Sequence, residues 1–296
     1  MNILSLFNGM STGHTALDNL GIKVNKYYSS EIKPSAIKLT QHHYPNTIQL
    51  GDVTKWKDWD IDYKSIDMVL SGSPCQDLSS AGKRAGLEGE RSSLFWVFVD
   101  ILNHVKELNP NVLFLQENVG SAPKSDVGIM SRALGVYPIR INSSLVTAQL
   151  RDRYYWTNIR TKPDGMFGDM VTDIPQLKDK KIMLKDILIS GKTNRDKHTC
   201  LMERYIKANT FANDDYESWE RYIKKRPKGM VTLIIDNNEY RLVNKVEMCR
   251  LQGFPDDWCD ILSYREAGSL LGDGWTLPII EHIFSFIKRR EASSGA

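Results

Sequence analysis

The sequence has 296 residues, of which 41% are hydrophobic and 25% charged, so it can bury one large core or two smaller ones. Its net charge of +3 is compatible with a nucleic-acid partner but does not by itself indicate one. The four cysteines form neither a C-x-x-C pair nor a Cys/His cluster, which argues against a zinc site or a disulfide framework. We therefore expect no metal and a cytoplasmic compartment, because no signal-peptide pattern and no run of about 20 apolar residues is present.

The first 70 residues predict the alternation of strands and helices that is typical of a nucleotide-binding α/β domain. We expect strands at 3–7, 24–30, 47–50 and 66–70, and helices at 14–20 and 34–43. Gly9 and Gly13 lie in the first strand-to-helix turn, but their spacing differs from the G-x-G-x-x-G fingerprint. A plain tight turn explains these two glycines equally well.

Two acidic residues directly follow predicted strands. Glu31 ends the second strand, where a carboxylate can accept hydrogen bonds from ribose hydroxyls, and a solvated surface glutamate is the equal alternative. Asp52 follows the third strand, where it can accept from an adenine amino group or simply serve as a turn residue.

The segment Ser71-Gly-Ser-Pro-Cys75-Gln-Asp places a cysteine just past the fourth strand, at the sheet edge where ligands bind in α/β domains. A single cysteine is more often inert core, so Cys75 gains meaning only from the residues around it. The next stretch, 79–89, carries three glycines without apolar periodicity and predicts a mobile loop.

Charged residues follow the next strands as well. A helix at 93–108 and an apolar strand at 112–115 lead into Glu117, where a charge is costly unless it is paired or functional. After a predicted strand at 139–146, Arg151 and Arg153 occupy one face of an extended segment. This pair suits an anionic or carbonyl-bearing ligand, with a solvated basic strand as the alternative.

The pattern changes at about residue 160. Residues 160–230 are basic and irregular with interleaved aromatics, a composition that suits nucleic acid, although ordinary charged surface also explains any one cluster. A hairpin is expected at 232–243 across Asn237 and Asn238, followed by a helix at 245–251. A second Gly turn at 272–274 enters a final helix at 279–287, which we expect to return to the sheet.

Taken together, these segments resemble the C5-cytosine DNA methyltransferases, chiefly the bacterial and phage type, from residue 3 to about 285. The matching pieces occur in the family's order: Phe7-x-Gly9, Glu31, Asp52, Pro74-Cys75-Gln76, Glu117-Asn118-Val119, Gln149-x-Arg151-x-Arg153, Leu251-Gln-Gly-Phe-Pro255 and Gly272-x-x-Trp275. The chain departs from the family in three places. Leu78 replaces a common Phe, Asp273 replaces Asn or Arg, and the Gly9–Gly13 turn is closer to the animal de novo enzymes.

The resemblance implies an α/β fold with a Rossmann-like S-adenosylmethionine-dependent methyltransferase domain at 1–159 and 264–296. A smaller, irregular target-recognition domain at 160–263 would be inserted before the C-terminal helix. The implied activity is transfer of a methyl group from S-adenosyl-L-methionine to C5 of a flipped-out cytosine in a short duplex DNA target, through a covalent Cys75–C6 adduct. The implied setting is a bacterial or phage protein, expected to be a monomer, that acts on double-stranded DNA either alone or beside a separate cognate restriction endonuclease.

The resemblance also implies roles for individual residues. The catalytic group would be Cys75, Glu117, Arg151 and Arg153. The cofactor-binding group would be Phe7, Gly9, Met10, Ser11, Thr12, Glu31, Ile32, Asp52, Val53, Pro74, Leu94, Asp273, Gly274 and Trp275. The DNA-binding group would be Gln76, Ser79, Arg84 and Arg91.

Two other functions remain open from the sequence. A tRNA cytosine-C5 methyltransferase on the same scaffold would share every catalytic residue, and the sizeable basic insert favours DNA over tRNA. A non-catalytic DNA-binding relative is the second alternative, and the intact catalytic group argues against it.

Overall fold

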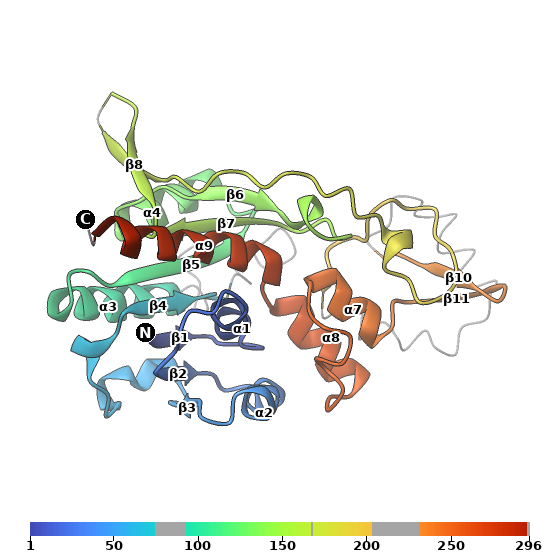
Figure 1. Cartoon of the computed structure of the whole chain (residues 1–296), viewed down its shortest axis with the longest axis horizontal. Coiled ribbons are helices and arrows are strands. Elements are labelled where there is room, and N and C mark those ends of the chain that lie inside the picture. The colour runs from blue at the N-terminus through green and yellow to red at the C-terminus, as the bar shows by residue number, and fades with distance from the viewer. Residues whose placement is uncertain (75–92, 167, 203–230, 295–296) are drawn as a thin grey trace. The chain divides into compact units, whose positions relative to one another are not determined.

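The computed structural model describes residues 1–74, 93–166, 168–202 and 231–294 (Figure 1). The chain divides into two compact units. The first contains residues 1–141, 152–176 and 280–296, and the second contains residues 142–151 and 177–279.

The first unit is built on a seven-stranded sheet of order β3-β2-β1-β4-β5-β7-β6. Strands β3, β2, β1, β4 and β5 are paired in parallel, and β7 runs antiparallel to β5. This is a mixed, Rossmann-like sheet, as the sequence predicted. The strands are β1 (Asn2–Leu6), β2 (Lys26–Ser30), β3 (Ile48–Gln49), β4 (Met68–Ser71), β5 (Leu113–Val119), β6 (Ile139–Asn142) and β7 (Asp152–Thr157).

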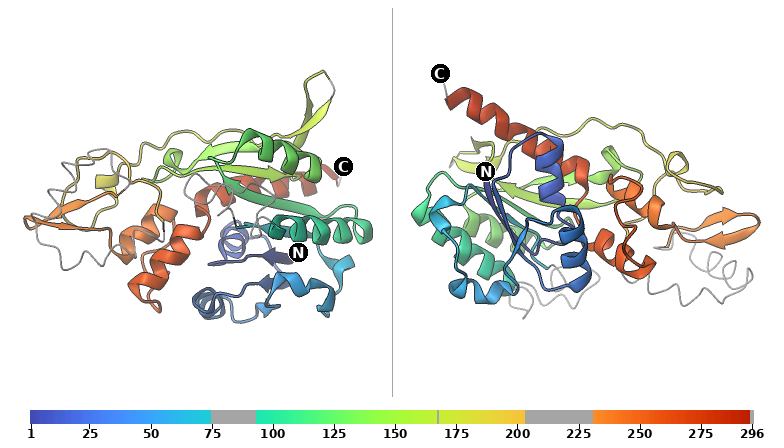
Figure 2. Two further views of the ribbon diagram at one scale, coloured as in Figure 1. Left: turned by 180° about the vertical axis from the view of Figure 1, so that it is seen from behind. Right: turned by 60° about the horizontal axis from the view of Figure 1, so that its bottom comes forward.

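Helices cover both faces of this sheet. Helix α9 passes in front of β5 and β7 in Figure 1, whereas α3 and α4 lie in front of the sheet in the view from behind in Figure 2. Parallel strands that are covered on both sides require nearly continuous apolar sequences, as 66–70 and 112–115 have. The helices are α1 (Thr12–Asn19), α2 (Pro34–His43), α3 (Ser93–Leu108), α4 (Lys124–Leu134) and α9 (Leu277–Ser294).

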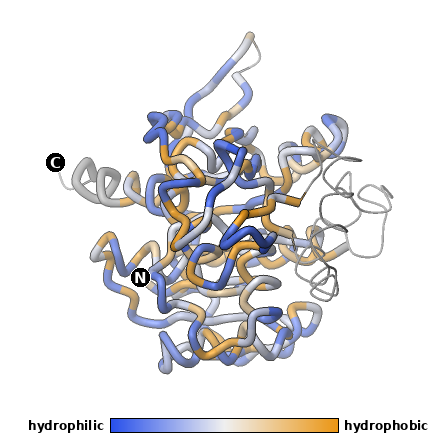
Figure 3. The backbone as a smooth tube through the Cα atoms, turned by 90° about the vertical axis from the view of Figure 1, so that its right-hand side faces the viewer, coloured by the Kyte–Doolittle hydropathy of each residue, from blue (hydrophilic) through white to orange (hydrophobic). Residues whose placement is uncertain are grey.

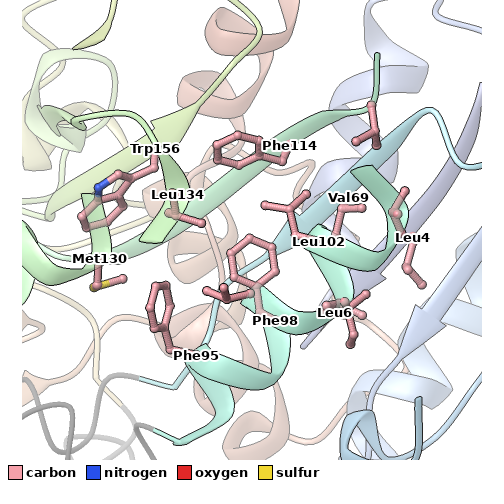
Figure 4. Close-up of a cluster of buried hydrophobic side chains, with 14 of the residues drawn as sticks. Leu4, Leu6, Val69, Phe95, Phe98, Leu102, Phe114, Met130, Leu134 and Trp156 are labelled. Carbon is pink, nitrogen blue, oxygen red and sulfur yellow. The ribbon is translucent and has the colours of Figure 1, made fainter. Parts of the chain in front are cut away.

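One large hydrophobic cluster joins the sheet to α3 and α4 (Figure 4). Its members are at most 9% exposed, and burying each large apolar side chain contributes about 1.5–3 kcal/mol. The cluster supports the strands whose carboxyl ends carry the candidate site. The labelled members are Leu4, Leu6, Val69, Phe95, Phe98, Leu102, Phe114, Met130, Leu134 and Trp156.

The predicted elements of the first unit are confirmed, with two corrections. Strand β5 was expected to end at Leu115 but continues to Val119, because β7 supplies an antiparallel partner as far as that residue. Strand β6 was expected to reach Val146 but ends at Asn142, where the Asn142 side chain accepts from the Ser144 N–H and begins a short 3-10 turn.

Three elements were not predicted from the sequence. Helix α4 contains Gly128, and Gly135 ends it with a φ of 74°. The hairpin of β8 (Thr161–Asp164) and β9 (Asp169–Thr172) projects from the first unit in Figure 1 and is coloured mainly as hydrophilic in Figure 3. Helix α8 (Tyr264–Asp273) begins with a capping box formed by Ser263 and Glu266.

The second unit contains the hairpin of β10 (Ile234–Asp236) and β11 (Glu239–Arg241), followed by α7 (Lys245–Gln252) and α8. Asn237 and Asn238 have φ values of 50° and 63°, the left-handed conformation expected for this turn. Arg241 donates to both carboxylate oxygens of the fully buried Glu247, at 2.8 and 2.9 Å. These two hydrogen bonds connect the β10–β11 hairpin to α7.

The compact units have different bounds from the predicted domains. The β8–β9 hairpin belongs to the first unit, and residues 142–151 and 264–279 belong to the second. The chain from residue 280 lies in the first unit, which confirms the expected return of the C-terminal helix. The assignment of catalysis and target recognition to separate domains stays a prediction.

Candidate active site

The turn between β1 and α1 has an unusual backbone. Phe7, Gly9 and Ser11 have φ values of 56°, 56° and 60°, and only glycine adopts this region without strain. Met10, Ser11 and Thr12 are at most 3% exposed, and the Ser11 N–H donates to the Asn8 carbonyl. Non-glycine residues with positive φ are concentrated at functional sites, where the surrounding structure maintains them.

Glu31 connects this turn to the end of β2. One carboxylate oxygen accepts from the Gly9 N–H at 2.8 Å, and the other accepts from the N–H groups of Ile32 and Lys33 at 2.8 and 2.9 Å. Glu31 is therefore a fixed group and not a freely solvated side chain. Beside it, Ile32 is 72% exposed and offers an apolar surface at the carboxyl edge of the sheet.

Asp52 caps the 3-10 turn Val53–Asp58 that follows β3. Its Oδ1 accepts from the Thr54 N–H and from the Thr54 hydroxyl, both at 2.9 Å, and these hydrogen bonds lower the pKa of the Asp52 carboxyl. Turn chemistry therefore accounts for this aspartate, and its contact with adenine stays a prediction. Val53 is buried in the core, while Pro74 and Leu94 are half-buried.

A buried ion pair occupies β5 and β7. The register places Glu117 opposite Tyr155 and Val119 opposite Arg153, so Glu117 and Arg153 are diagonal neighbours on one face. The Arg153 Nε lies 2.8 Å from the Glu117 Oε1, and their side chains are 13% and 10% exposed. The sheet thus brings together two of the four predicted catalytic residues.

Arg151 has different partners from Arg153. It belongs to the second unit, is 2% exposed, and donates to the carbonyls of Gly272 at 2.9 Å and Gly274 at 2.8 Å. The Asp273 carbonyl lies 3.5 Å away, whereas the Asp273 side chain is exposed and Trp275 is half-buried. Arg151 thus satisfies carbonyls at the end of α8, which differs from the expectation that both arginines address one ligand. Its supporting role in catalysis stays a prediction.

Sequence reasoning missed a second polar contact at this edge of the sheet. Gln116, which is fully buried, donates from Nε2 to the Ser73 hydroxyl at 2.9 Å and to the Glu117 carbonyl at 2.7 Å. The sequence feature that could have indicated this contact is the amide side chain of Gln116, which directly follows the apolar run 112–115.

The remaining predicted residues, Cys75, Gln76, Ser79, Arg84 and Arg91, lie outside the described residues. Within the described ranges, no group of three or more His, Cys, Asp or Glu side chains is placed to bind a metal ion. No described helix is both long enough and apolar enough to cross a lipid bilayer.

Comparison with known proteins gives one family. Residues 1–289 match the profile described as "C-5 cytosine-specific DNA methylase". The chain is 32% identical over 257 residues to "Orphan methyltransferase M.SPRI" of Bacillus phage SPR, covering 81% of this chain and 52% of that one. It is 27% identical over 284 residues to "Type II methyltransferase M1.ScrFI" of Lactococcus lactis subsp. cremoris, covering 88% and 71%. The chain thus spans about half the length of the phage relative.

Solved structures share the fold. The chain is similar to a putative DNA modification methyltransferase encoded within an E. coli prophage, with a TM-score of 0.61 and 18% identity over 98% of this chain and 99% of that one. It is also similar to the Entamoeba histolytica methyltransferase EhMeth, with a TM-score of 0.68 and 13% identity over 98% of each chain. At these identities the likeness shows the methyltransferase fold alone.

Proposed function

Because the chain belongs to the C-5 cytosine-specific DNA methylase family, we propose that it transfers a methyl group from S-adenosyl-L-methionine to C5 of a cytosine in double-stranded DNA. The observation that carries this proposal is the buried Glu117–Arg153 pair. It lies on β5 and β7, and β5 pairs with β4, the strand that leads into Pro74 and Cys75. A carboxylate and a guanidinium held in this way can both contact a polar, planar ring.

The β1–α1 turn and Glu31 fit the proposed cofactor. The Glu31 carboxylate is fixed by three backbone N–H groups and keeps one of its roughly four lone-pair sites, on Oε2, for a ribose hydroxyl. The exposed Ile32 side chain offers an apolar surface to an adenine ring, and the strained turn at 7–12 presents backbone groups to the methionine part. When bound, S-adenosyl-L-methionine supplies an electrophilic methyl group.

The chemistry requires a nucleophile because C5 of cytosine is itself a poor one. The Cys75 thiolate adds to C6, and the displaced electron pair makes C5 nucleophilic toward the methyl group. Glu117 faces N3 and the exocyclic amine, where it stabilises charge that develops on the ring, and Arg153 orients Glu117 and contacts O2. Once C5 carries the methyl group, a water molecule takes the C5 proton, the C5=C6 double bond re-forms, and the Cys75–C6 bond breaks to release the thiolate.

The target cytosine has to leave the duplex before Cys75 can reach it. Unstacking a base costs a few kcal/mol, roughly, and contacts in the pocket offset that cost. We assign these contacts to Gln76, Ser79, Arg84 and Arg91, and recognition of a short target to the segment at 160–263. We further propose that the chain acts as a monomer in a bacterial or phage-infected cytoplasm, beside a separate cognate endonuclease.

Methyl transfer assayed in parallel on duplex DNA and on tRNA tests the proposal. We expect labelled methyl groups from S-adenosyl-L-methionine to appear in the DNA only, and bisulfite sequencing of DNA from an expressing host to map the target. An oligonucleotide with 5-fluorocytosine at the mapped position should form a covalent adduct through Cys75. Cys75→Ala should lose turnover and the adduct while its cofactor affinity stays within about twofold.

Three outcomes would contradict this proposal. Methylation of tRNA alone would assign the alternative RNA substrate. Cofactor and DNA binding without turnover in the wild type would indicate a non-catalytic relative. An adduct that persists in Cys75→Ala would move the nucleophile to another residue.

A further inference from the structure

The backbone pairing between β4 and β5 ends shortly before Cys75 in the sequence. The parallel pairing ends with Ser71 opposite Gln116, while β5 continues through Val119 with β7 as its partner. Residues 72–74 therefore extend beyond the last paired residue of β4. Among the described residues, a side-chain hydrogen bond holds this segment against β5.

The Gln116 side chain provides that connection. Its Nε2 donates to the Ser73 hydroxyl at 2.9 Å and to the Glu117 carbonyl at 2.7 Å. A carbonyl only accepts hydrogen bonds, so the contact with the Glu117 carbonyl fixes which end of the carboxamide carries the N–H groups. One NH₂ group thus joins the residue two positions before Cys75 to the backbone of the residue that carries the proposed catalytic carboxylate.

The surroundings of Gln116 indicate a role beyond stability. Gln116 is fully buried and Ser73 is 4% exposed, so neither hydrogen bond competes with bulk water. A buried glutamine is costly unless its hydrogen bonds are made, and Nε2 makes both of the contacts that reach Ser73 and the Glu117 carbonyl. An apolar side chain at this position would make neither contact.

We propose that Gln116 is a positioning residue, which holds Ser73, two residues past the end of β4, at a set distance from Glu117 of β5 through its hydrogen bonds to the Ser73 hydroxyl and to the Glu117 carbonyl. Because successive side chains of a strand point to opposite faces, Gln116 performs this role from the face opposite Glu117. It touches neither substrate nor cofactor. The inference rests on the proposed function, since it concerns the step in which Cys75 adds to the cytosine.

A double-mutant cycle with Gln116→Met and Ser73→Ala tests this role. Methionine keeps the length of the glutamine side chain but removes both donors. We expect each single variant to reduce the single-turnover rate of methyl transfer and of 5-fluorocytosine adduct formation by about 10- to 100-fold, as misplacement of reacting groups does. The rate of the double variant should be no lower than that of the less active single variant, because both changes remove the same Gln116–Ser73 hydrogen bond. Cofactor affinity should stay within about twofold.

Thr157→Val is the matched control. The Thr157 side chain is fully buried, and its hydroxyl donates to the Phe114 carbonyl at 2.6 Å. This contact lies near the start of β5, away from Gln116 and Glu117. We expect this variant to lower thermal stability with little change in rate. Hydrogen exchange of the peptide 69–74 should increase in the Gln116 and Ser73 variants and stay at the wild-type level in the control.

The outcomes separate this inference from the proposed function. A wild type that methylates no cytosine would overturn the proposed function, and the exchange measurement would still report whether Gln116 orders residues 69–74. An active wild type with variants of unchanged rate would overturn the positioning role. Rates that fall only in proportion to melting temperature, or that multiply in the double variant, would also overturn it.

Discussion

The Glu117–Arg153 pair shows how a single residue depends on its strand partner. Both side chains are largely removed from water, which is costly for isolated charges, and the 2.8 Å contact offsets that cost. Removing one partner leaves the other charge buried without its counter-ion. Stability and activity should therefore both respond to changes at this pair.

Replacing Glu117 with Gln keeps the shape of the side chain but removes its charge. We expect the free energy of unfolding to fall by about 3–5 kcal/mol, because the largely buried Arg153 loses its 2.8 Å contact with a carboxylate. Methyl transfer should fall by about 100-fold or more, since an amide cannot act as the carboxylate does. Urea unfolding and single-turnover kinetics measure the two effects. A variant with wild-type turnover would remove Glu117 from the proposed chemistry.

His14 is the second residue with a marked local effect. Its ring stacks between Tyr27 and Tyr44 with centroid distances of 4.3 and 3.8 Å. Burial lowers the pKa of His14 to about 4, and the nearby Asp18 carboxylate only partly opposes this shift. The folded state thus binds this proton less readily than the unfolded chain, whose histidines titrate near pH 6.5.

The sign of the pH effect follows from the lowered pKa. The stability associated with neutral His14 is complete above about pH 6.5 and is lost as the pH falls toward 4. We expect His14→Phe, which keeps an aromatic ring in the stack, to lose less stability than the wild type between pH 7.5 and pH 5, by about 1 kcal/mol. Urea midpoints at the two pH values measure this difference. The His14→Phe variant should retain some pH dependence from His198, because burial lowers the pKa of that histidine to about 4 as well. Equal pH slopes in the two proteins would contradict the assignment.

At the scale of elements, the β1–α1 turn and β2 are joined by a carboxylate and not by strand pairing alone. Glu31 accepts from Gly9 of the turn and from Ile32 and Lys33 at its own strand end. It thereby stabilises a turn in which three residues have positive φ. The same element is the proposed cofactor site, so its order and its affinity for the cofactor should change together.

Glu31→Gln tests this coupling. The amide replaces one acceptor oxygen with a donor, which opposes the backbone N–H groups on that side. We expect the dissociation constant for S-adenosyl-L-methionine to rise about tenfold or more, the effect of losing one hydrogen bond to a charged group. Titration calorimetry measures the constant. Glu239→Gln, at the exposed first residue of β11, is the control and should bind as the wild type does. An unchanged affinity in Glu31→Gln would place the cofactor elsewhere.

At the scale of the whole molecule, the chain returns to complete its first unit. Residues from 280 onward belong to the unit that contains β1, although more than a hundred residues of the second unit precede them. Ile280, Ile283, Phe284 and Ile287 of α9 are at most 2% exposed. The sheet is therefore not fully covered until the last helix has been made.

Phe284→Ala measures the contribution of this return. Truncating a fully buried phenylalanine typically costs about 3–5 kcal/mol, a large part of the stability of a domain. We expect a melting temperature lower by several degrees and weaker cofactor binding at physiological temperature. Ser285→Ala, at the next position of α9, removes only a hydroxyl that donates to the His282 carbonyl and should change little. A Phe284 variant as stable as Ser285→Ala would show that α9 contributes little to the core.

The sequence by itself determined the local elements and the family. The apolar run 66–70, the Asn237–Asn238 turn and the Pro34 helix start carry their structural signal within a few residues, so they were predicted nearly to their bounds. The order of the motifs from Phe7 to Trp275 indicates the C5-cytosine methyltransferases, and the family match over residues 1–289 confirms it.

Only the tertiary structure decided which side chains meet. The pairing of β5 with the distant β7 extended β5 to Val119 and placed Glu117 beside Arg153, while the carbonyls after α8 became the partners of Arg151. The Gln116–Ser73 contact and the attachment of Glu31 to Gly9 likewise join residues 43 and 22 positions apart. Local patterns report propensity and burial, whereas a hydrogen bond or an ion pair depends on where another part of the chain arrives when the core closes.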